Sequence, residues 1–342
     1  MTFSVTEEER SASAMADEKI ARVVEEIETR GFAVVSGLIS AETCELLAAS
    51  VLEDADRVRA LGKPTLHEEA TSRGHLQLGL RRYAPYAHPE LLANPLLEQV
   101  VSAVLGPAAW LGFYNGNVNL PDSGHQPLHY DRPFSWRTRE KAERDGQTWP
   151  PPTTTLSCSV ALSDITEDTG ATEVYPGTHL ETAVTEWEAG ERLSDHPELV
   201  ERWGPPERMA IPAGGVCFRD PRMWHRGVPN PSDQARPMPA VTYHAERCRH
   251  ARGRLIKNMT PADVERCRHD PTLRILDDGQ LGDGRLVFDE SARAAFTDNP
   301  SLYDVNRNSR FVAEPQRVNH FLDAHLIGGA RVVSSGAISP EE

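Results

Sequence analysis

A histidine and an aspartate stand two positions apart, at His129 and Asp131, in the stretch PLHYDRPF over residues 127–134. If this stretch is a β-strand, its side chains alternate between two faces, so the imidazole and the carboxylate project from the same face. Such polar groups are costly in an apolar interior unless a partner satisfies them. A divalent metal ion is such a partner, and two ligands from one strand leave room for a third from elsewhere.

A second histidine and an arginine supply what this pair lacks. His225 lies 96 positions after His129, far enough along the chain to sit on an opposing strand, and Arg236 follows His225 by eleven positions after a turn rich in glycine and proline. A hairpin of this kind brings Arg236 beside the His225 strand, where a buried guanidinium needs an anion such as a carboxylate held by two hydrogen bonds. Two histidines and one carboxylate on one face are the ligand set of non-haem iron(II) oxygenases.

The elements that must position these groups differ between the two parts of the chain. Apolar residues recur at helical spacing over 16–31, FAVVSGLI follows as a short buried strand, and Ser40 is a good N-cap for a second helix. Residues 89–105 predict one or two further helices. Short strand-like pieces then alternate with glycine, proline, asparagine and aspartate. This order predicts an α+β chain whose second part is a barrel or sandwich.

Three segments are predicted along the chain. Residues 1–16 are acidic and polar and predict a flexible N-terminus, residues 17–248 hold the barrel domain, and residues 249–342 form a polar C-terminal extension. We expect the extension to pack on the barrel or at the contact of a homodimer. The polar loop 132–153 follows directly after the first two candidate ligands. Because a long loop inside a compact domain is usually functional, we expect a lid or substrate-facing flap there.

The composition argues against several classes of partner and location. The formal net charge of −15 argues against nucleic acid or an anionic membrane surface as a partner, because both are negatively charged. No apolar run approaches the roughly 20 residues that a membrane span needs, and the N-terminus lacks the basic and apolar regions of a secretory signal. The five cysteines are scattered and do not form a disulfide framework, so we expect a cytoplasmic location.

Five pieces of the chain, in order, resemble the phytanoyl-CoA dioxygenase-like family of iron(II)/2-oxoglutarate-dependent dioxygenases. They are GFAVVSGLISAETCELL, NPLLEQVVSAVLGP, SGHQPLHYD, ALSDITEDTGATEVYPGTH and FRDPRMWHRGVPN. The resemblance covers roughly residues 17–246. It implies a double-stranded β-helix, the jelly-roll, cupin-like barrel, with the N-terminal helices packed on it.

The resemblance also implies roles for single residues. His129, Asp131 and His225 would bind Fe(II), and Arg236 would pair with the distal carboxylate of 2-oxoglutarate. Three further residues match positions that contact this cosubstrate in relatives: Gln126, Thr172 and, by a looser match, Gln77. In the PGTH piece we expect His179 to serve a turn rather than a metal.

The implied reaction uses O2 and couples the decarboxylation of 2-oxoglutarate, to succinate and CO2, with oxidation of an unactivated C–H bond in a small molecule. Related halogenases lack the carboxylate ligand, so Asp131 implies hydroxylation or another oxidation rather than chlorination. Desaturation, epoxidation and cyclisation stay open. No segment resembles a cradle for the phosphates of coenzyme A, which favours tailoring of a natural product over catabolic hydroxylation of an acyl-CoA.

Two other classes of protein fit part of the pattern. A metal-dependent isomerase, lyase or hydrolase on a cupin-like barrel would use His129, Asp131 and His225 with zinc or manganese, but would have no use for Arg236 as a carboxylate clamp. A binding or regulatory protein with a degenerate site would need none of the four residues together.

Overall fold

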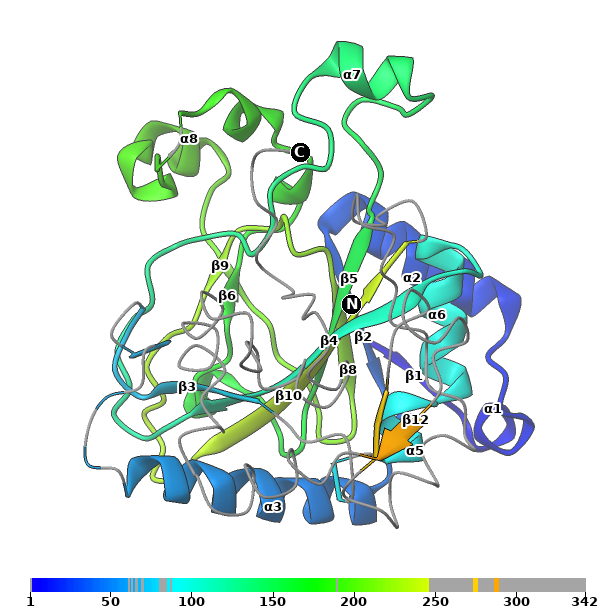
Figure 1. Ribbon diagram of the computed structural model, residues 1–342, viewed down its shortest axis with the longest axis vertical. Helices are drawn as coiled ribbons and strands as arrows, with labels where there is room; N and C mark the ends of the chain where they lie inside the picture. Colours follow the sequence, from blue (N-terminus) through cyan, green and yellow to red (C-terminus); the bar gives the residue numbers. More distant parts are fainter. Residues whose placement is uncertain are drawn as a thin grey trace.

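A large and a small β-sheet face each other in the computed structural model, and helices cover the outer side of the larger sheet (Figure 1). One apolar cluster joins the helices to the larger sheet, and a second lies between the two sheets. The molecule is therefore α+β. The structure describes residues 2–60, 62, 64, 67–68, 71–79, 85–86, 88–188 and 190–245, and the backbone of residues 273–275 and 286–288.

The larger sheet has seven strands in the order β1-β2-β8-β5-β10-β4-β3, and only β1 and β2 pair in parallel. Its strands are β1 (Thr2–Ser4), β2 (Phe32–Ser36), β3 (His75–Gly79), β4 (Trp110–Asn119), β5 (Thr155–Val160), β8 (Val216–Arg219) and β10 (Arg236–His244). The smaller sheet has the order β7-β6-β9, with β7 (Glu207–Arg208), β6 (Glu173–Val174) and β9 (His225–Arg226). Among the described residues these two ladders stay separate and do not close into one barrel.

Three long helices pack on the outer side of the larger sheet: α2 (Asp17–Arg30), α3 (Ala41–Arg59) and α6 (Pro95–Leu105). The other described helices are short: α1 (Glu7–Ala12), α5 (Pro89–Leu92), α7 (Arg139–Arg144) and α8 (Pro197–Arg202), with 3-10 turns η1 (Glu167–Thr169), η2 (Thr178–Leu180), η3 (Thr182–Glu186) and η4 (Leu193–Asp195). No helix among the described residues is both long and apolar enough to cross a lipid bilayer.

The helix boundaries follow from local side-chain chemistry. Ser40 caps α3, because its hydroxyl accepts a hydrogen bond from the Thr43 amide at 3.2 Å. Asn94 caps α6 in the same way through the amides of the next turn. Helix α2 ends at Gly31, whose φ of 86° is a left-handed conformation that glycine adopts without strain. The helices predicted over 16–31, after Ser40 and over 89–105 are therefore confirmed.

Alternation along the strands separates the core beneath the helices from a cavity with polar lining between the sheets. In β5, Leu156, Cys158 and Val160 belong to the core beneath the helices, whereas Ser157 and Ser159 point the other way and line a cavity. The inward faces of β3, β4, β8 and β10 contribute to the same cavity. The polar side chains that line the cavity all lie on the inner side of the larger sheet, so this side carries the chemistry.

The N-terminal segment differs from the sequence prediction. Residues 1–16 are predicted to be flexible, yet β1 and α1 lie within them. Phe3 of β1 is buried in the main core, and the strand pairs in parallel with β2. Helix α1 is fixed by a capping box in which Thr6 and Glu9 bond each other's backbone amides. A long-range strand pairing of this kind leaves no local signal in a three-residue segment.

The stretch 127–134 is also less regular than predicted. His129 forms a single antiparallel bridge to His225, with both backbone hydrogen bonds made, at 3.0 and 2.9 Å, but the stretch does not continue as a strand. Pro127 and Pro133 flank this bridge and have no amide hydrogen to donate to a ladder.

The predicted C-terminal extension, residues 249–342, lies outside the described residues apart from two short strands. These strands, β11 (Leu273–Ile275) and β12 (Leu286–Phe288), pair antiparallel with each other. The proposed packing of the extension on the barrel or at a homodimer contact, and its boundary with the domain at 248, stay predictions.

Candidate active site

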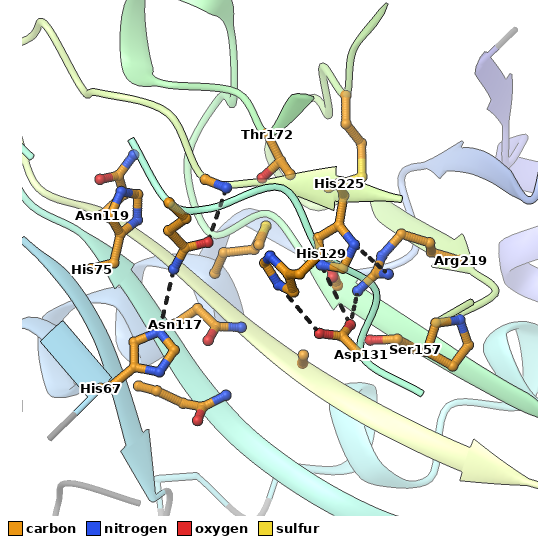
Figure 2. Close-up of a pocket in the computed structure, with 18 of the residues that line it drawn as sticks. His67, His75, Asn117, Asn119, His129, Asp131, Ser157, Thr172, Arg219 and His225 are labelled. Atoms are coloured by element: carbon orange, nitrogen blue, oxygen red, sulfur yellow. Dashed lines mark hydrogen bonds and ion pairs between the residues drawn. The ribbon is translucent and has the colours of Figure 1, made fainter. Parts of the chain in front are cut away.

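A cavity of about 280 Å³ lies between the two sheets and gathers the candidate residues from both (Figure 2). His129, Asp131 and His225 stand at one side of it, and Arg236 lines it as well. The rest of its polar lining includes His67, His75, Gln77, Asn117, Asn119, Gln126, Ser157, Ser159, Thr172 and Arg219.

The three predicted ligands converge on one point. One nitrogen of His129, one nitrogen of His225 and one carboxylate oxygen of Asp131 all lie within 4.8 Å of one another. The His129 Nε2 atom is 3.6 Å from Asp131 Oδ1, and the His225 Nε2 atom is 3.4 Å from Asp131 Oδ2. Two histidine nitrogens and a carboxylate oxygen this close could hold a metal ion.

Backbone carbonyls orient both imidazoles toward that point. His129 Nδ1 lies 2.8 Å from the Pro127 oxygen, and His225 Nδ1 lies 2.9 Å from the Met223 oxygen. A carbonyl can only accept, so each Nδ1 carries the hydrogen and each Nε2 keeps its lone pair for a metal. A guanidinium nitrogen of Arg219 is also 3.3 Å from His225 Nδ1, but two donors cannot bond each other, and the shorter contact to Met223 decides the tautomer.

The electrostatics keep Asp131 ionised and His225 neutral. Burial works against the charged form of Asp131, but His225 and Arg219 outweigh it, so the pKa of this carboxyl lies well below its usual value. Burial, followed by the positive charge of Arg219, lowers the pKa of His225 to about 4. For His129 burial lowers the pKa, but the hydrogen bond and charge of Asp131 outweigh it, and the pKa is raised.

Arg236 is a buried cation without an anionic partner among the described residues. It opens strand β10, is 4% exposed, and donates only to neutral acceptors, including the Thr169 oxygen at 3.4 Å and the Gly170 oxygen at 3.1 Å. Burial lowers its pKa to about 10, which still leaves it charged at neutral pH. A desolvated guanidinium that faces a cavity is a site for an anion, above all a carboxylate.

The three weaker candidates also line the cavity. Gln126 is held in place, since its Oε1 accepts a hydrogen bond from the Gly227 amide at 2.9 Å and its amide nitrogen lies 3.3 Å from His67 Nε2. Thr172 is 7% exposed and precedes β6 on the smaller sheet, and Gln77 lies on β3 of the larger sheet. The fold thus places each of them where a bound small molecule would meet it, on different sides of the same space.

Arg219 is the main residue of the site that sequence reasoning missed. It ends strand β8, is 7% exposed, and donates a hydrogen bond to Asp131 Oδ2 at 2.6 Å. In the stretch FRDPR it stands among other charged residues. Its only sequence signal is strand alternation, which places it on the same inward face as Cys217.

The loop between β8 and β9 connects several of these groups. Asp220 and Arg222 form a buried ion pair within it, with Asp220 Oδ2 and an Arg222 guanidinium nitrogen 2.7 Å apart. The Pro221 oxygen in the same loop accepts a hydrogen bond from the Asp131 amide at 2.9 Å. The ion pair therefore stabilises a loop that carries His225 at its end and fixes the backbone of Asp131.

Two residues near the site have structural roles. His179 is buried beside Gly31, its Nε2 lies 3.1 Å from the Glu28 oxygen, and it sits in turn η2, as predicted. Trp224 is fully buried in an aromatic cluster with Phe134 and Trp203. Neither lines the cavity.

The loop predicted as a lid contains helix α7 and projects beyond the sheets (Figure 1). Its buried anchor is Phe134, over whose ring the Arg222 guanidinium lies at 4.8 Å. Trp136 donates instead to Asp145 within the loop itself. Only Arg132, at its base, lines the cavity, so a role as a flap stays a prediction.

Comparison with known proteins gives one family. The family model described as phytanoyl-CoA dioxygenase (PhyH) matches residues 27–238. A curated relative, "Dioxygenase andF" from Emericella variicolor, is 25% identical over 181 residues, which are 50% of this chain and 57% of the relative. The chain thus spans little more than half the length of that relative.

Two solved structures are similar to this chain, and the first of them shows the same fold. EvdMO1 has a TM-score of 0.50 and 21% identity, over 66% of this chain and 50% of that one. AviO1 from Streptomyces viridochromogenes Tue57 has a TM-score of 0.47 and 19% identity, over 68% of this chain and 97% of that one.

Proposed function

Because this chain belongs to the phytanoyl-CoA dioxygenase family, we propose that it is an iron(II)- and 2-oxoglutarate-dependent dioxygenase acting on a small molecule. The two facing sheets would then be the halves of a double-stranded β-helix, and the cavity between them the active site. The proposal rests first on Arg236, a buried cation in the same cavity as a two-histidine, one-carboxylate group.

The residues present fit Fe(II). Both Nε2 atoms are free to bind because both Nδ1 atoms are used by carbonyls, and Asp131 is ionised. His129, Asp131 and His225 would hold the ion, which when bound supplies the one-electron chemistry that O2 activation needs. Because all three ligands line the cavity, the open positions of the ion would face the substrate and cosubstrate.

The protein's own part is to bind and orient the cosubstrate. Arg236 would hold the distal carboxylate of 2-oxoglutarate through its planar fork, and Gln126 and Thr172 would hydrogen-bond its polar atoms. Gln77 faces the same space from β3. The cation is already buried before the ligand arrives, so the site is preorganised for an anion and needs little rearrangement to accept one.

The reaction would couple release of succinate and CO2 to oxidation of a C–H bond, most often hydroxylation. The lining around the triad offers neutral hydrogen-bonding groups such as Asn117, Ser157 and His67. His67 is neutral because burial lowers its pKa to about 4. Groups of this kind suit a polar organic molecule, which supports a natural product rather than an acyl-CoA as the substrate.

An anaerobic titration tests the proposal. Adding Fe(II) and then 2-oxoglutarate to the metal-free protein should produce the weak visible charge-transfer band of the metal–cosubstrate chelate. A metal-dependent isomerase, lyase or hydrolase would bind Zn(II) or Mn(II) at the same triad without any effect of 2-oxoglutarate. Metal binding with no band and no 2-oxoglutarate binding would therefore refute the oxygenase assignment.

A further inference from the structure

Arg219 contacts Asp131, the carboxylate of the candidate metal site. Its side chain is 8% exposed, and Nη2 donates to Asp131 Oδ2 at 2.6 Å (Figure 2). A charge-assisted hydrogen bond of this length is among the stronger polar contacts in proteins. One of the two carboxylate oxygens is therefore already engaged before any metal binds.

The backbone around Arg219 holds this contact in place. Arg219 is paired on both sides within the larger sheet, with Phe32 of β2 and Ser157 of β5. The next residue, Asp220, donates its amide to the Gly31 oxygen at 2.8 Å. Because the Asp131 amide also bonds to Pro221 of the same loop, backbone and side chain of Asp131 are both fixed by the end of β8.

The two oxygens of Asp131 consequently have different surroundings. Oδ2 accepts from Arg219 and lies 3.4 Å from His225 Nε2, whereas Oδ1 lies 3.6 Å from His129 Nε2. A carboxylate with both oxygens free binds a cation through one oxygen or through both. Each carboxylate oxygen has more than one lone pair, but turning Oδ2 toward the ion would lengthen its 2.6 Å contact with Arg219, so the two-oxygen mode is disfavoured.

We propose that Arg219 is a positioning residue that restricts Asp131 to coordination through one oxygen. This rests on the proposed function, since it assumes a metal at the triad. A six-coordinate ion with three protein ligands keeps three open positions. The cosubstrate chelate takes two of them, so a second oxygen from Asp131 would take the position left for the remaining reactant.

The test counts water ligands on Mn(II), which prefers six oxygen-type ligands and reports bound water through EPR line broadening in H2(17)O. The wild type should show three exchangeable waters, and Arg219→Met should show two, because Asp131 then chelates with both oxygens. Arg219→Lys is the matched control, since it keeps a cationic donor, and it should restore three. If Arg219→Met does not fold, as judged by its thermal midpoint, Arg219→Leu takes its place with the same expectation.

The possible outcomes distinguish a failure of the proposed role of Arg219 from a failure of the proposed oxygenase function. Three waters in the folded, Mn(II)-loaded methionine variant, or two in the wild type, would overturn the role of Arg219 and leave the oxygenase assignment intact. A wild-type protein that binds no Mn(II) at the triad would overturn both. A loss of water in Arg219→Lys equal to that in Arg219→Met would also overturn the proposal, because a cationic donor would then not be the cause.

Discussion

Replacing Arg236 with methionine should weaken binding of the cosubstrate without lowering the stability of the fold. The substitution removes a guanidinium that is 4% exposed and bonds only neutral acceptors among the described residues. Most buried arginines are paired with an anion and stabilise the protein through it. Arg236 has no such partner in the part of the chain that the structure describes, so its loss should weaken 2-oxoglutarate binding without weakening the ligand-free protein.

The structure gives the magnitude of both effects. Burial lowers the pKa of Arg236 from 12.5 to about 10, which is a cost of about 3 kcal/mol for the charged form in the ligand-free protein. Removing one partner of a buried ion pair costs about 3–5 kcal/mol. At about 1.4 kcal/mol for each factor of ten, the dissociation constant for 2-oxoglutarate should rise by roughly 10²-fold to several thousand-fold.

Calorimetric titration of 2-oxoglutarate into the Mn(II)-loaded protein measures the affinity, and thermal unfolding without ligands measures the stability. We expect the thermal midpoint of Arg236→Met to be unchanged or raised. Arg30→Met is the control, because Arg30 pairs with Glu26 and Glu207 at the surface, and it should leave cosubstrate affinity unchanged. Unaltered 2-oxoglutarate affinity in Arg236→Met would refute the reasoning.

Three further predictions concern the cavity wall, the β8–β9 loop and pH. Gly227→Ala places a Cβ 2.8 Å from Gln126 Oε1 and 2.6 Å from His75 Cε1, so Gln126 must move. Calorimetry should then show weaker 2-oxoglutarate binding with Mn(II) affinity retained. Unchanged 2-oxoglutarate affinity would exclude a role for Gln126. Asp220→Ala leaves Arg222 buried without its anionic partner and should lower the free energy of unfolding by about 3–5 kcal/mol. Lys141→Met, which breaks an exposed pair with Asp145, should lower it far less. Equal losses in urea titrations would contradict this. Burial lowers the pKa of His179 in the folded protein, so below the ordinary pKa of histidine the unfolded chain binds more protons than the folded one. The free energy of unfolding should therefore fall as the pH drops from about 7.5 to 5.5. The metal-free His179→Gln variant should lose less stability over that range, and an identical pH dependence would refute this role of His179.

The chemistry of the site is more visible in the sequence than its geometry. The order of a histidine–aspartate pair, a distant histidine and an arginine eleven positions later predicts a ligand group and a carboxylate site, and the structure brings all four residues to one cavity. The alternation rule gives the correct relation of His129 and Asp131 even though the stretch is a single bridge and not a strand, because the two residues still contribute to the same face of the cavity.

Long-range contacts account for what the sequence does not reveal. Arg219 reaches Asp131 across 88 positions, and nothing in the local pattern FRDPR distinguishes it from the structural ion pair of Asp220 and Arg222 beside it. Strand β1 forms only because Phe3 finds the core and β2 lies beside it. Local propensity identifies elements such as α2 and α3, but pairings between distant segments depend on the assembled fold.

The central claim is that His129, Asp131 and His225 hold an iron ion while Arg236 holds the far carboxylate of 2-oxoglutarate in the same cavity. Crystals grown without oxygen, with Fe(II) and 2-oxoglutarate, test it through an anomalous difference map at the iron edge. The account predicts one iron peak bonded to both Nε2 atoms and to Asp131, with the distal carboxylate of the cosubstrate on the Arg236 guanidinium. An iron peak away from the two imidazoles, or a cosubstrate whose distal carboxylate does not contact Arg236, would contradict it.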